Sequence, residues 1–189
     1  CRSEVELDQD IKAKISLFCN LPADCVITAL DVKHIYNVPL CFHKEGLDEK
    51  IAELLGIWTK DPDLHAWEDL TNKLNNLQSE VSIGIVGKYV HLEDSYKSLN
   101  EALVHAGIAN TVKVKLQFID AEELEHEKEL AKRLNKLDGI LVPGGFGERG
   151  VEGKLLAIRF ARENKVPYYG ICLGMQLAVI EFARNVCGL

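Results

Sequence analysis

From residue 81 onward the sequence alternates between short apolar segments and longer amphipathic segments. The apolar segments predict four strands, over 81–87, 112–119, 139–142 and 166–171. The segments after them have helical spacing and predict four helices, over 94–107, 121–137, 150–164 and 173–185. Strands that alternate with helices form parallel sheets covered by helices on both faces. The alternation therefore predicts an α/β fold of this kind for residues 81–189.

The unusual residues of this region come directly after the predicted strands. They are the segment 87–89 (Gly-Lys-Tyr), Asp120, the segment 143–147 (Pro-Gly-Gly-Phe-Gly) and Cys172. The carboxyl ends of parallel strands meet at one edge of the sheet, where such folds carry their active groups. We therefore expect the four segments to lie along one edge.

Cys172 stands between Gly170 and Gly174, after an apolar run and before an amphipathic one. This layout is the cysteine counterpart of the strand–Gly-x-Ser-x-Gly–helix turn that presents a nucleophile. A turn this sharp needs the glycines, because a Cβ on either side would clash. The turn exposes the thiol at the start of a helix, where the partial positive charge of the helix end favours the nucleophilic thiolate. The pattern predicts covalent catalysis by Cys172 at a carbonyl carbon.

A thiol nucleophile also needs a base. An isolated cysteine in an apolar segment is most often an inert core residue, so the case for catalysis depends on the flanking glycines. The six histidines have no visible link to Cys172, and we expect them to be surface residues. They are His34, His43, His65, His91, His105 and His126.

The segment 143–150 follows the strand predicted over 139–142 and contains four glycines. A glycine-rich loop after a strand is often a phosphate cradle, but this one has neither the P-loop spacing nor G-x-G-x-x-G. Its bare backbone amides are suited to face an oxyanion formed at Cys172. The loop indicates an oxyanion hole more strongly than a nucleotide site.

Residues 1–57 mix short elements and predict a separate domain. Helices are expected over 8–19 and 46–56, a strand over 25–30, and a helical turn that Pro39 ends. Residues 58–80 change character, with a polar turn and then a polar helix over 65–77 whose apolar stripe is expected to be a packing face. We predict domains over 1–57 and 81–189, joined by a linker over 58–80.

Composition excludes several classes of protein. The net charge of −7 and the absence of a basic cluster argue against a nucleic-acid surface. No apolar run approaches the ~20 residues of a membrane span. The six cysteines form no C-x-x-C pair, which predicts reduced thiols in a cytoplasmic protein and neither a disulfide framework nor a zinc site. Because the chain starts at Cys1 and stops at the end of a helix, we expect it to be a piece of a longer polypeptide.

Several motifs in fixed order resemble the class I glutamine amidotransferases and, among them, the CTP synthase family. The glycine loop and the segment 170–176 (Gly-Ile-Cys-Leu-Gly-Met-Gln) carry the first resemblance. The resemblance to the CTP synthase family rests on seven further segments, namely 87–89, 94–98, 147–154, 159–162, 1–3, 12–19 and 31–36. The resemblance implies a flavodoxin-like amidotransferase domain, preceded by the C-terminal part of a P-loop-type α/β synthetase domain.

The resemblance implies that UTP becomes CTP, with ATP activating the uracil 4-oxygen and ammonia coming from glutamine. Cys172 would attack the glutamine side-chain amide and form a glutamyl thioester. The backbone around Gly145 and Leu173 would stabilise the oxyanion. The glutamine and oxyanion residues implied in this way are Gly144, Gly145, Phe146, Leu173, Gly174, Met175 and Gln176.

The same resemblance implies nucleotide sites. Arg2, Asp31 and Val32 match positions used for the ATP adenine, and Lys14 and Phe18 match positions near UTP and CTP. Without the resemblance, these residues would be interpreted as surface charges, and Phe18 as an aromatic ring of the core. Lys88 matches a position linked to GTP, the allosteric activator. Further implications are Mg²⁺ with ligands outside this chain, CTP as feedback inhibitor, and a homo-oligomer, a tetramer in the family.

The chain departs from the family pattern in what it lacks. The family's catalytic His-x-Glu stretch lies far downstream of the cysteine, and this chain ends seventeen positions after Cys172. The P-loop and the magnesium ligands are also outside it, so we expect the 189-residue chain alone to make no CTP. Two alternatives stay open: another class I amidotransferase, and a non-catalytic assembly module with a glutaminase fold. Residues 1–57 argue against the first, and the intact Cys172 against the second.

Overall fold

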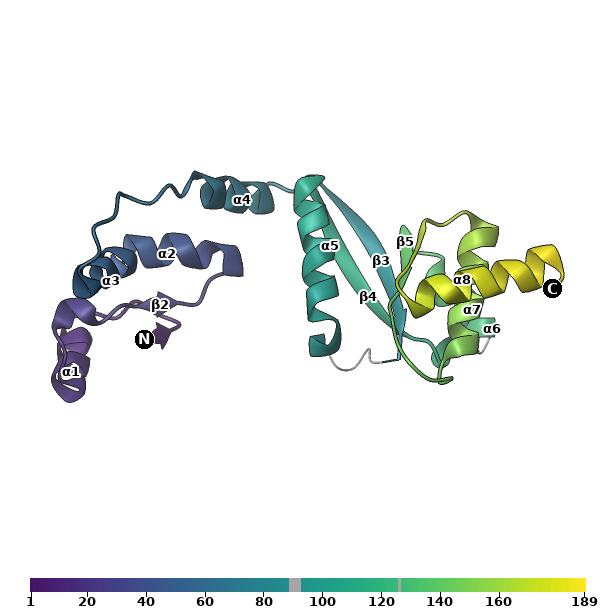
Figure 1. Cartoon of the computed structure of the whole chain (residues 1–189), viewed down its shortest axis with the longest axis horizontal. Coiled ribbons are helices and arrows are strands. Elements are labelled where there is room, and N and C mark those ends of the chain that lie inside the picture. Colours follow the sequence, from purple (N-terminus) through teal and green to yellow (C-terminus); the bar gives the residue numbers. More distant parts are fainter. Residues whose placement is uncertain (89–92, 126) are drawn as a thin grey trace. The chain divides into compact units, whose positions relative to one another are not determined.

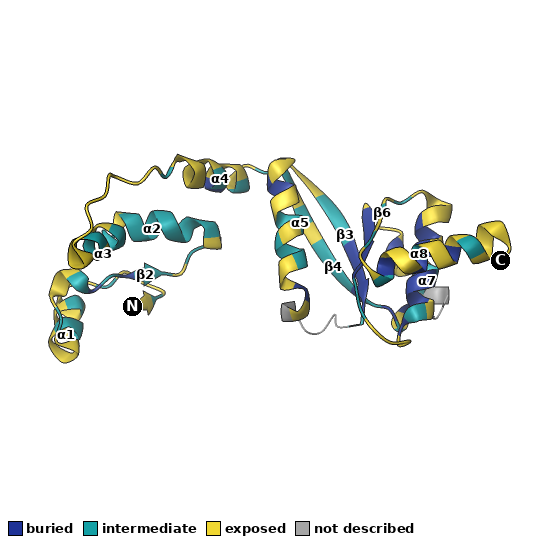
Figure 2. Ribbon diagram, in the orientation of Figure 1, coloured by how far each residue is buried: buried dark blue, intermediate teal, exposed yellow. Residues whose placement is uncertain are grey.

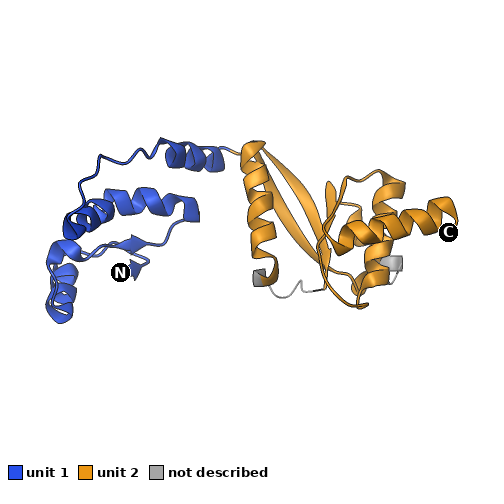
Figure 3. Cartoon of the chain, in the orientation of Figure 1, with its two compact units in different colours: residues 1–76 blue, residues 77–189 orange. Residues whose placement is uncertain are grey.

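The structure is a computed structural model that describes residues 1–88, 93–125 and 127–189. The chain divides into unit 1, residues 1–76, and unit 2, residues 77–189 (Figure 3). Unit 1 includes the helix that the sequence assigns to a linker, and the domain boundaries at residues 57 and 80 stay predictions. Within the described residues, no helix combines the length and the apolar character needed to span a bilayer.

Unit 1 consists of short helices and a two-stranded parallel sheet (Figure 1). Strand β1 (Arg2–Ser3) pairs with β2 (Ala29–Leu30). The helices are α1 (Gln9–Cys19), η1 (Ala23–Cys25), η2 (Ile35–Asn37), α2 (Val38–Lys44), α3 (Leu47–Leu55) and α4 (His65–Asn75). Asp8 caps α1 by accepting a hydrogen bond from the Ile11 N–H at 2.8 Å, as its sequence position predicts.

Two local predictions in unit 1 were wrong. The strand expected over 25–30 is only Ala29–Leu30, because the chain first makes the helical turn η1. Pro39 does not end a helix but lies in the first turn of α2. There its missing N–H is not needed for the helical hydrogen bonds, so proline is compatible with the start of a helix.

Unit 2 contains a four-stranded sheet in the order β4-β3-β5-β6, and every neighbouring pair is parallel. The strands are β3 (Ser79–Gly87), β4 (Val112–Asp120), β5 (Gly139–Val142) and β6 (Tyr168–Gly170). They end directly before Lys88, Ala121, Pro143 and Ile171. The segments expected at one sheet edge therefore lie at the strand ends, with Gly87 and Asp120 as the last residues of β3 and β4, and Tyr89 lies outside the described residues.

Helices cover both faces of this sheet, which confirms the predicted α/β fold. Helix α5 (Lys97–Ala109) lies on one face, and α6 (Glu127–Leu134), α7 (Val151–Asn164) and α8 (Leu173–Phe182) lie on the other (Figure 1). The single turns η3 (Glu93–Tyr96) and η4 (Glu123–Glu125) precede α5 and α6, and the π-helical turn η5 (Ala183–Cys187) continues α8. Right-handed crossovers between parallel strands account for this placement.

The largest buried apolar cluster lies between the sheet and α6 to α8 (Figure 2). Strand β5 is buried along its whole length, as a central strand covered on both faces must be. The cluster includes Val86, Ile119, Leu134, Ile140, Val142, Leu155, Ile158, Phe160 and Leu177. This core fixes the strand ends and the start of α8, on which the candidate site depends.

The two helices after β3 and β4 differ from expectation. Gly107 does not stop α5 but is buried inside it, where an added Cβ would lie 2.5 Å from the Val112 carbonyl oxygen. Ala106, expected on the inward face, is exposed. The single helix expected over 121–137 is the turn η4 followed by the shorter α6. Asp94 is the predicted cap of the helix expected over 94–107, and its side chain is outside the part that the structure describes.

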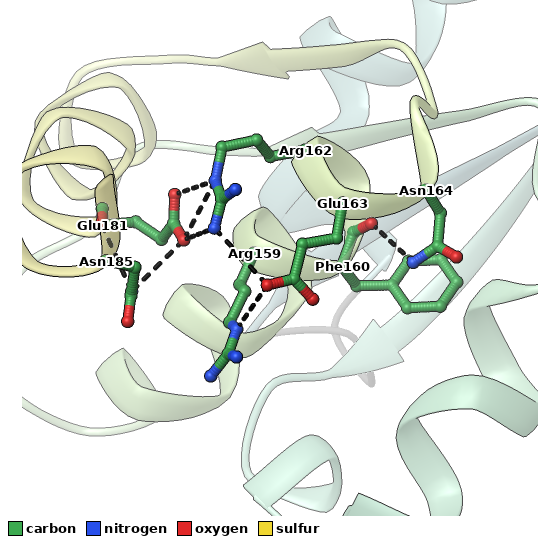
Figure 4. Close-up of polar contacts among 7 residues, drawn as sticks. All are labelled: Arg159, Phe160, Arg162, Glu163, Asn164, Glu181 and Asn185. Atoms are coloured by element: carbon green, nitrogen blue, oxygen red, sulfur yellow. Dashed lines mark hydrogen bonds and ion pairs between the residues drawn. The ribbon is translucent and has the colours of Figure 1, made fainter.

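A buried ion pair joins α7 to α8 (Figure 4). The Arg162 guanidinium donates to the Glu181 carboxylate through Nη2 at 2.8 Å and through Nε at 3.0 Å. Asn185 Nδ2 donates to the same carboxylate at 3.2 Å. The Glu181 side chain is 2% exposed, whereas the Arg162 side chain is 33% exposed. The pair therefore fixes the C-terminal half of α8 against α7.

This asymmetry in burial leads to a stability prediction. Replacing Arg162 with Met leaves the buried Glu181 carboxylate without its cation, and we expect the melting temperature to fall by roughly 10 °C. Replacing Glu181 with Met leaves Arg162, which reaches water, and we expect a smaller loss. Thermal unfolding of the two variants measures the difference. Equal losses, or a larger loss for Glu181→Met, would contradict this account of the pair.

Candidate functional site

Cys172 lies in the sharp turn between β6 and α8 that its sequence position predicts. It is the N-cap residue of α8, and its backbone has φ 49° and ψ −105°. A residue with a Cβ rarely adopts this conformation, which costs about 1–3 kcal/mol and persists only where the surroundings enforce it. The residue is exposed and its thiol is free. The turn thus holds a strained backbone in order to present one thiol.

The flanking glycines allow the turn to pack against the sheet. A Cβ added at Gly174 would lie 2.1 Å from the Val142 carbonyl oxygen, at the end of β5. A Cβ added at Gly170 would lie 2.5 Å from the carbonyl carbon of Gly174. Both contacts are far below van der Waals distance, and the second is to backbone within the turn itself. The prediction that both glycines are needed for steric reasons is confirmed.

Hydrogen bonds fix the start of α8. The Ile171 N–H donates to the Val142 carbonyl at 3.0 Å, and the Gln176 N–H donates to the Cys172 carbonyl at 3.1 Å. The Tyr168 hydroxyl donates to the Gly174 carbonyl at 2.8 Å. Burial raises the pKa of Tyr168, so this hydroxyl stays protonated as a donor. Together these bonds enforce the conformation of Cys172.

The glycine loop after β5 lies beside the cysteine. A Cβ built on Gly144 would lie 3.5 Å from Cys172 Cβ, and one built on Gly145 would lie 3.8 Å from Leu173 Cδ2. Within the described residues, the N–H groups of Gly145 and Leu173 donate to no backbone carbonyl. Donors without a protein acceptor beside a nucleophile are what an oxyanion hole requires.

The remaining predicted glutamine residues lie on the same part of the surface. Met175 and Gln176 are exposed in the first turn of α8, and Phe146 is 88% exposed at the tip of the loop. The structure therefore brings the loop and the first turn of α8 together around Cys172.

Two lysines lie close to the glycine loop. Lys88, which follows β3, donates a short hydrogen bond from Nζ to the Phe146 carbonyl. The Nζ of Lys154, on α7, lies 4.0 Å from the position of a Cβ built on Gly145. Burial and, second, the charge of Lys88 lower the pKa of Lys154. Lys154 ends the motif 147–154, but it was not among the predicted site residues.

The histidines give no base for Cys172 in the described part of unit 2. His105 lies on α5 and is exposed, and His91 and His126 lie outside the described residues. His34, His43 and His65 belong to unit 1. The predicted nucleophile and the N–H groups expected to act as oxyanion donors lie in unit 2, and the described residues around them supply no imidazole.

Unit 1 contains a cavity of about 480 Å³ at the end of its small sheet. The predicted adenine residues Arg2, Asp31 and Val32 all line it. Arg2 Nε donates to Asp31 Oδ1 at 2.8 Å, and this hydrogen bond holds the pKa of Asp31 below its usual range. Apolar walls come from residues that sequence reasoning missed, namely Ile35, Val38 and Phe42. A flat heterocycle could lie between these walls and the Asp31 carboxylate.

The residues predicted for UTP and CTP lie elsewhere in unit 1. Lys14 and Phe18 are one helical turn apart on α1, and both are exposed, Phe18 at 87%. Neither lines the cavity at Arg2 and Asp31. The spacing puts a cation and an aromatic ring on one face of α1. An exposed aromatic ring beside a lysine is consistent with a binding surface, and nothing in unit 1 itself covers it.

Comparison with known proteins identifies the unit that carries Cys172. Residues 91–188 match the family model for glutamine amidotransferase class-I. The chain belongs to the class-I glutamine amidotransferase family. Residues 1–57 match a second model, CTP synthase N-terminus. A glutamine amidotransferase with this N-terminal segment is the combination that the sequence motifs predicted.

Relatives with high identity agree along the whole chain. A CTP synthase of Syntrophus aciditrophicus is 61% identical over 189 residues, which is 100% of this chain and 35% of that protein. A CTP synthase of Geobacter sulfurreducens is 58% identical over 190 residues, again 100% of this chain and 35% of the relative. The chain thus spans about a third of the length of these relatives. The resemblance to CTP synthases is confirmed.

A solved structure supports the fold of unit 2. The glutaminase domain of Trypanosoma brucei CTPS with bound acivicin is 49% identical and has a TM-score of 0.54. The match covers 57% of this chain and 42% of that one. The amidotransferase fold, with its parallel sheet and flanking helices, is therefore confirmed.

Proposed function

We propose that this amidotransferase hydrolyses glutamine at Cys172 and that the ammonia aminates UTP to CTP at the expense of ATP. The observation that carries the proposal is the exposed Cys172 thiol, held at φ 49° between Gly170 and Gly174 beside the Gly145 N–H, which donates to no backbone carbonyl within the described residues. The N-terminal segment and the CTP synthase relatives support CTP as the product. They argue against another amidotransferase and against a non-catalytic module.

The chemistry begins with attack of the Cys172 thiolate on the side-chain amide carbon of glutamine. The new C–S bond displaces the carbonyl π electrons onto oxygen, and the N–H groups of Gly145 and Leu173 donate hydrogen bonds to this oxyanion. When the carbonyl reforms, the C–N bond breaks and ammonia leaves with the proton that the thiol gave up. Water then cleaves the thioester to glutamate and restores the thiol.

The side chains near the thiol would select the substrate. Met175 and Gln176 follow the cysteine in the first turn of α8, Phe146 is exposed on the neighbouring glycine loop, and Gly174 keeps the helix start close to the sheet. We assign them to the glutamine pocket. The proposed base, an imidazole held by a carboxylate in the family, is not among the described residues of unit 2.

In unit 1 we assign ATP to the cavity at Arg2, Asp31 and Val32. The ionised Asp31 carboxylate can accept a hydrogen bond from an adenine amino group, and Ile35, Val38 and Phe42 offer apolar contact to the ring. Mg²⁺ does not fit this cavity, because its one carboxylate is engaged by Arg2. The described residues contain no cluster of three or more side chains able to hold a metal ion.

This assignment predicts a selective loss of ATP binding. We expect Asp31→Ala in the complete polypeptide to raise the KM for ATP about tenfold, the value of one charge-assisted hydrogen bond, without changing glutamine hydrolysis. Asp24→Ala is the matched control, because Asp24 is also exposed and paired with a cation, Lys50, in unit 1. Steady-state kinetics with varied ATP measure the effect. The same KM in both variants would refute the placement of ATP.

The remaining assignments follow the resemblance. We place the UTP and CTP phosphates near Lys14 with Phe18 as an aromatic neighbour, GTP near Lys88, and the protein in a homo-oligomer, a tetramer as in the family. All six cysteines lie in the described residues and are free, which supports a reducing compartment such as the cytoplasm. CTP is expected to inhibit its own formation.

The test is an assay of the complete polypeptide with glutamine, UTP, ATP, Mg²⁺ and GTP. We expect glutamate and CTP to form together. Glutamate without CTP would indicate an amidotransferase with another acceptor. Absence of glutamate, with CTP formed from ammonium salts alone, would indicate that the glutaminase unit is not catalytic.

A further inference from the structure

Among the described residues of unit 2, Lys154 is the largest of the fully buried side chains. It is 2% exposed, and it lies in the first half of α7. Ile158 and Ala161, four and seven residues later, continue the same buried stripe and belong to the apolar core. A lysine at such a position is rare unless it is paired.

No hydrogen bond or ion pair of Lys154 is found within the described residues. Two carboxylates, one on α7 and one after β4, lie next to other cations. Glu152, on the same helix, lies 3.9 Å from Arg184, and Glu122 accepts a short hydrogen bond from Arg149. A lysine whose side chain is 2% exposed loses much of the hydration of its charge, and this burial, followed by the charge of Lys88, lowers the pKa of Lys154. Packing alone would be better served by an apolar side chain of the same size.

The position of the Lys154 ammonium suggests what it does. Its Nζ approaches Gly145, and the Nζ of Lys88 binds the next carbonyl of the loop, that of Phe146. In a trans peptide the carbonyl and the N–H point in opposite directions. Cations near a loop therefore favour carbonyls turned toward them and N–H groups turned away. Gly145 lies in this loop, and its N–H donates to no backbone carbonyl within the described residues. The preceding residue, Gly144, lies beside Cys172.

We propose that Lys154 is a positioning residue of the oxyanion hole, which holds the loop 144–146 with its N–H groups toward Cys172. The inference rests on the proposed glutamine hydrolysis and deepens it. The buried charge both orients the loop and adds positive potential where the oxyanion forms. A preorganised donor set acts on the transition state and much less on substrate binding.

Lys154→Met in the complete polypeptide tests the proposal, since Met has similar volume and no charge. We expect kcat for glutamine hydrolysis to fall about tenfold, less than the ~10²-fold loss of a direct oxyanion donor, with the KM for glutamine within about twofold. We also expect the melting temperature to stay the same or rise, because an unpaired buried charge is removed. Lys136→Met, which removes an exposed lysine of unit 2, is the matched control and should change neither quantity.

The outcomes separate the inference from the function on which it rests. An unchanged kcat in Lys154→Met, or a lower kcat accompanied by a lower melting temperature, would overturn the positioning role and indicate a structural one. A rise in KM alone would also overturn it. If the unsubstituted polypeptide hydrolyses no glutamine, the proposed function fails. If the unsubstituted protein hydrolyses glutamine and the Lys154→Met variant does so at the same rate, only the role of Lys154 is refuted.

Discussion

Cys172→Ala in the complete polypeptide is expected to lose glutamine-dependent CTP formation by at least about a thousandfold, because no other group can form the thioester. Synthesis from ammonium salts should stay within about twofold of the unsubstituted rate, since it bypasses the glutaminase chemistry. The thiol is exposed and makes no structural hydrogen bond in the described residues, so its loss should leave the fold intact. Parallel assays with glutamine and with ammonium chloride measure the two activities.

The control for this experiment is Cys187→Ala. Cys187 is also an exposed free thiol of unit 2, but it lies in the π-helical turn at the far end of α8. We expect this variant to keep both activities. Loss of ammonia-dependent synthesis in Cys172→Ala would contradict the division of labour between the two units. Retention of glutamine-dependent synthesis would exclude Cys172 as the nucleophile.

Gly174→Ala is expected to cause the second largest effect, on both stability and glutamine hydrolysis. Its Cβ would lie 2.1 Å from the Val142 carbonyl oxygen and 3.0 Å from Val142 Cβ. Either α8 must move away from β5 or the end of the strand must shift. Overpacking of this kind costs about 3 kcal/mol, and a shift of α8 also displaces Cys172 from the oxyanion donors. Thermal unfolding and a glutaminase assay measure the two effects.

Gly145→Ala provides the comparison for stability. A Cβ at this position meets no atom closer than 3.8 Å, so we expect the melting temperature to stay close to that of the unsubstituted protein. A difference of several degrees between the two glycine variants would support the account of the turn. If Gly174→Ala unfolds at the same temperature as Gly145→Ala, the close approach of α8 to β5 is not what requires the glycine.

The fold of unit 2 and the centre of its site are predictable from the sequence because they depend on local signals. The strand over 139–142 matches β5 residue for residue, since a short buried run has few alternatives. Gly170 and Gly174 identify the turn, because only glycine fits where the backbone of a helix meets the end of a strand. Family motifs then added the chemistry and the likeness to CTP synthases.

Other features depend on contacts between distant segments, which local patterns do not encode. Gly107 resembles a helix stop, but its neighbour Val112 comes from the next strand. The apolar walls of the cavity at Asp31 come from η2 and α2, where the sequence predicts only a helical turn that Pro39 ends. The sequence does contain a signal for Lys154, because its spacing places it on the same stripe of α7 as Ile158 and Ala161. If that stripe is taken as the core face of the helix, Lys154 is predicted to be a buried lysine.

The central claim is that Cys172 reacts covalently with glutamine. The most direct measurement treats the complete polypeptide with the glutamine analogue 6-diazo-5-oxo-norleucine and locates the modified residue by peptide mass spectrometry. We predict one modified cysteine, Cys172, in proportion to the loss of glutaminase activity, and protection by excess glutamine. Complete inactivation with Cys172 unmodified would contradict the claim.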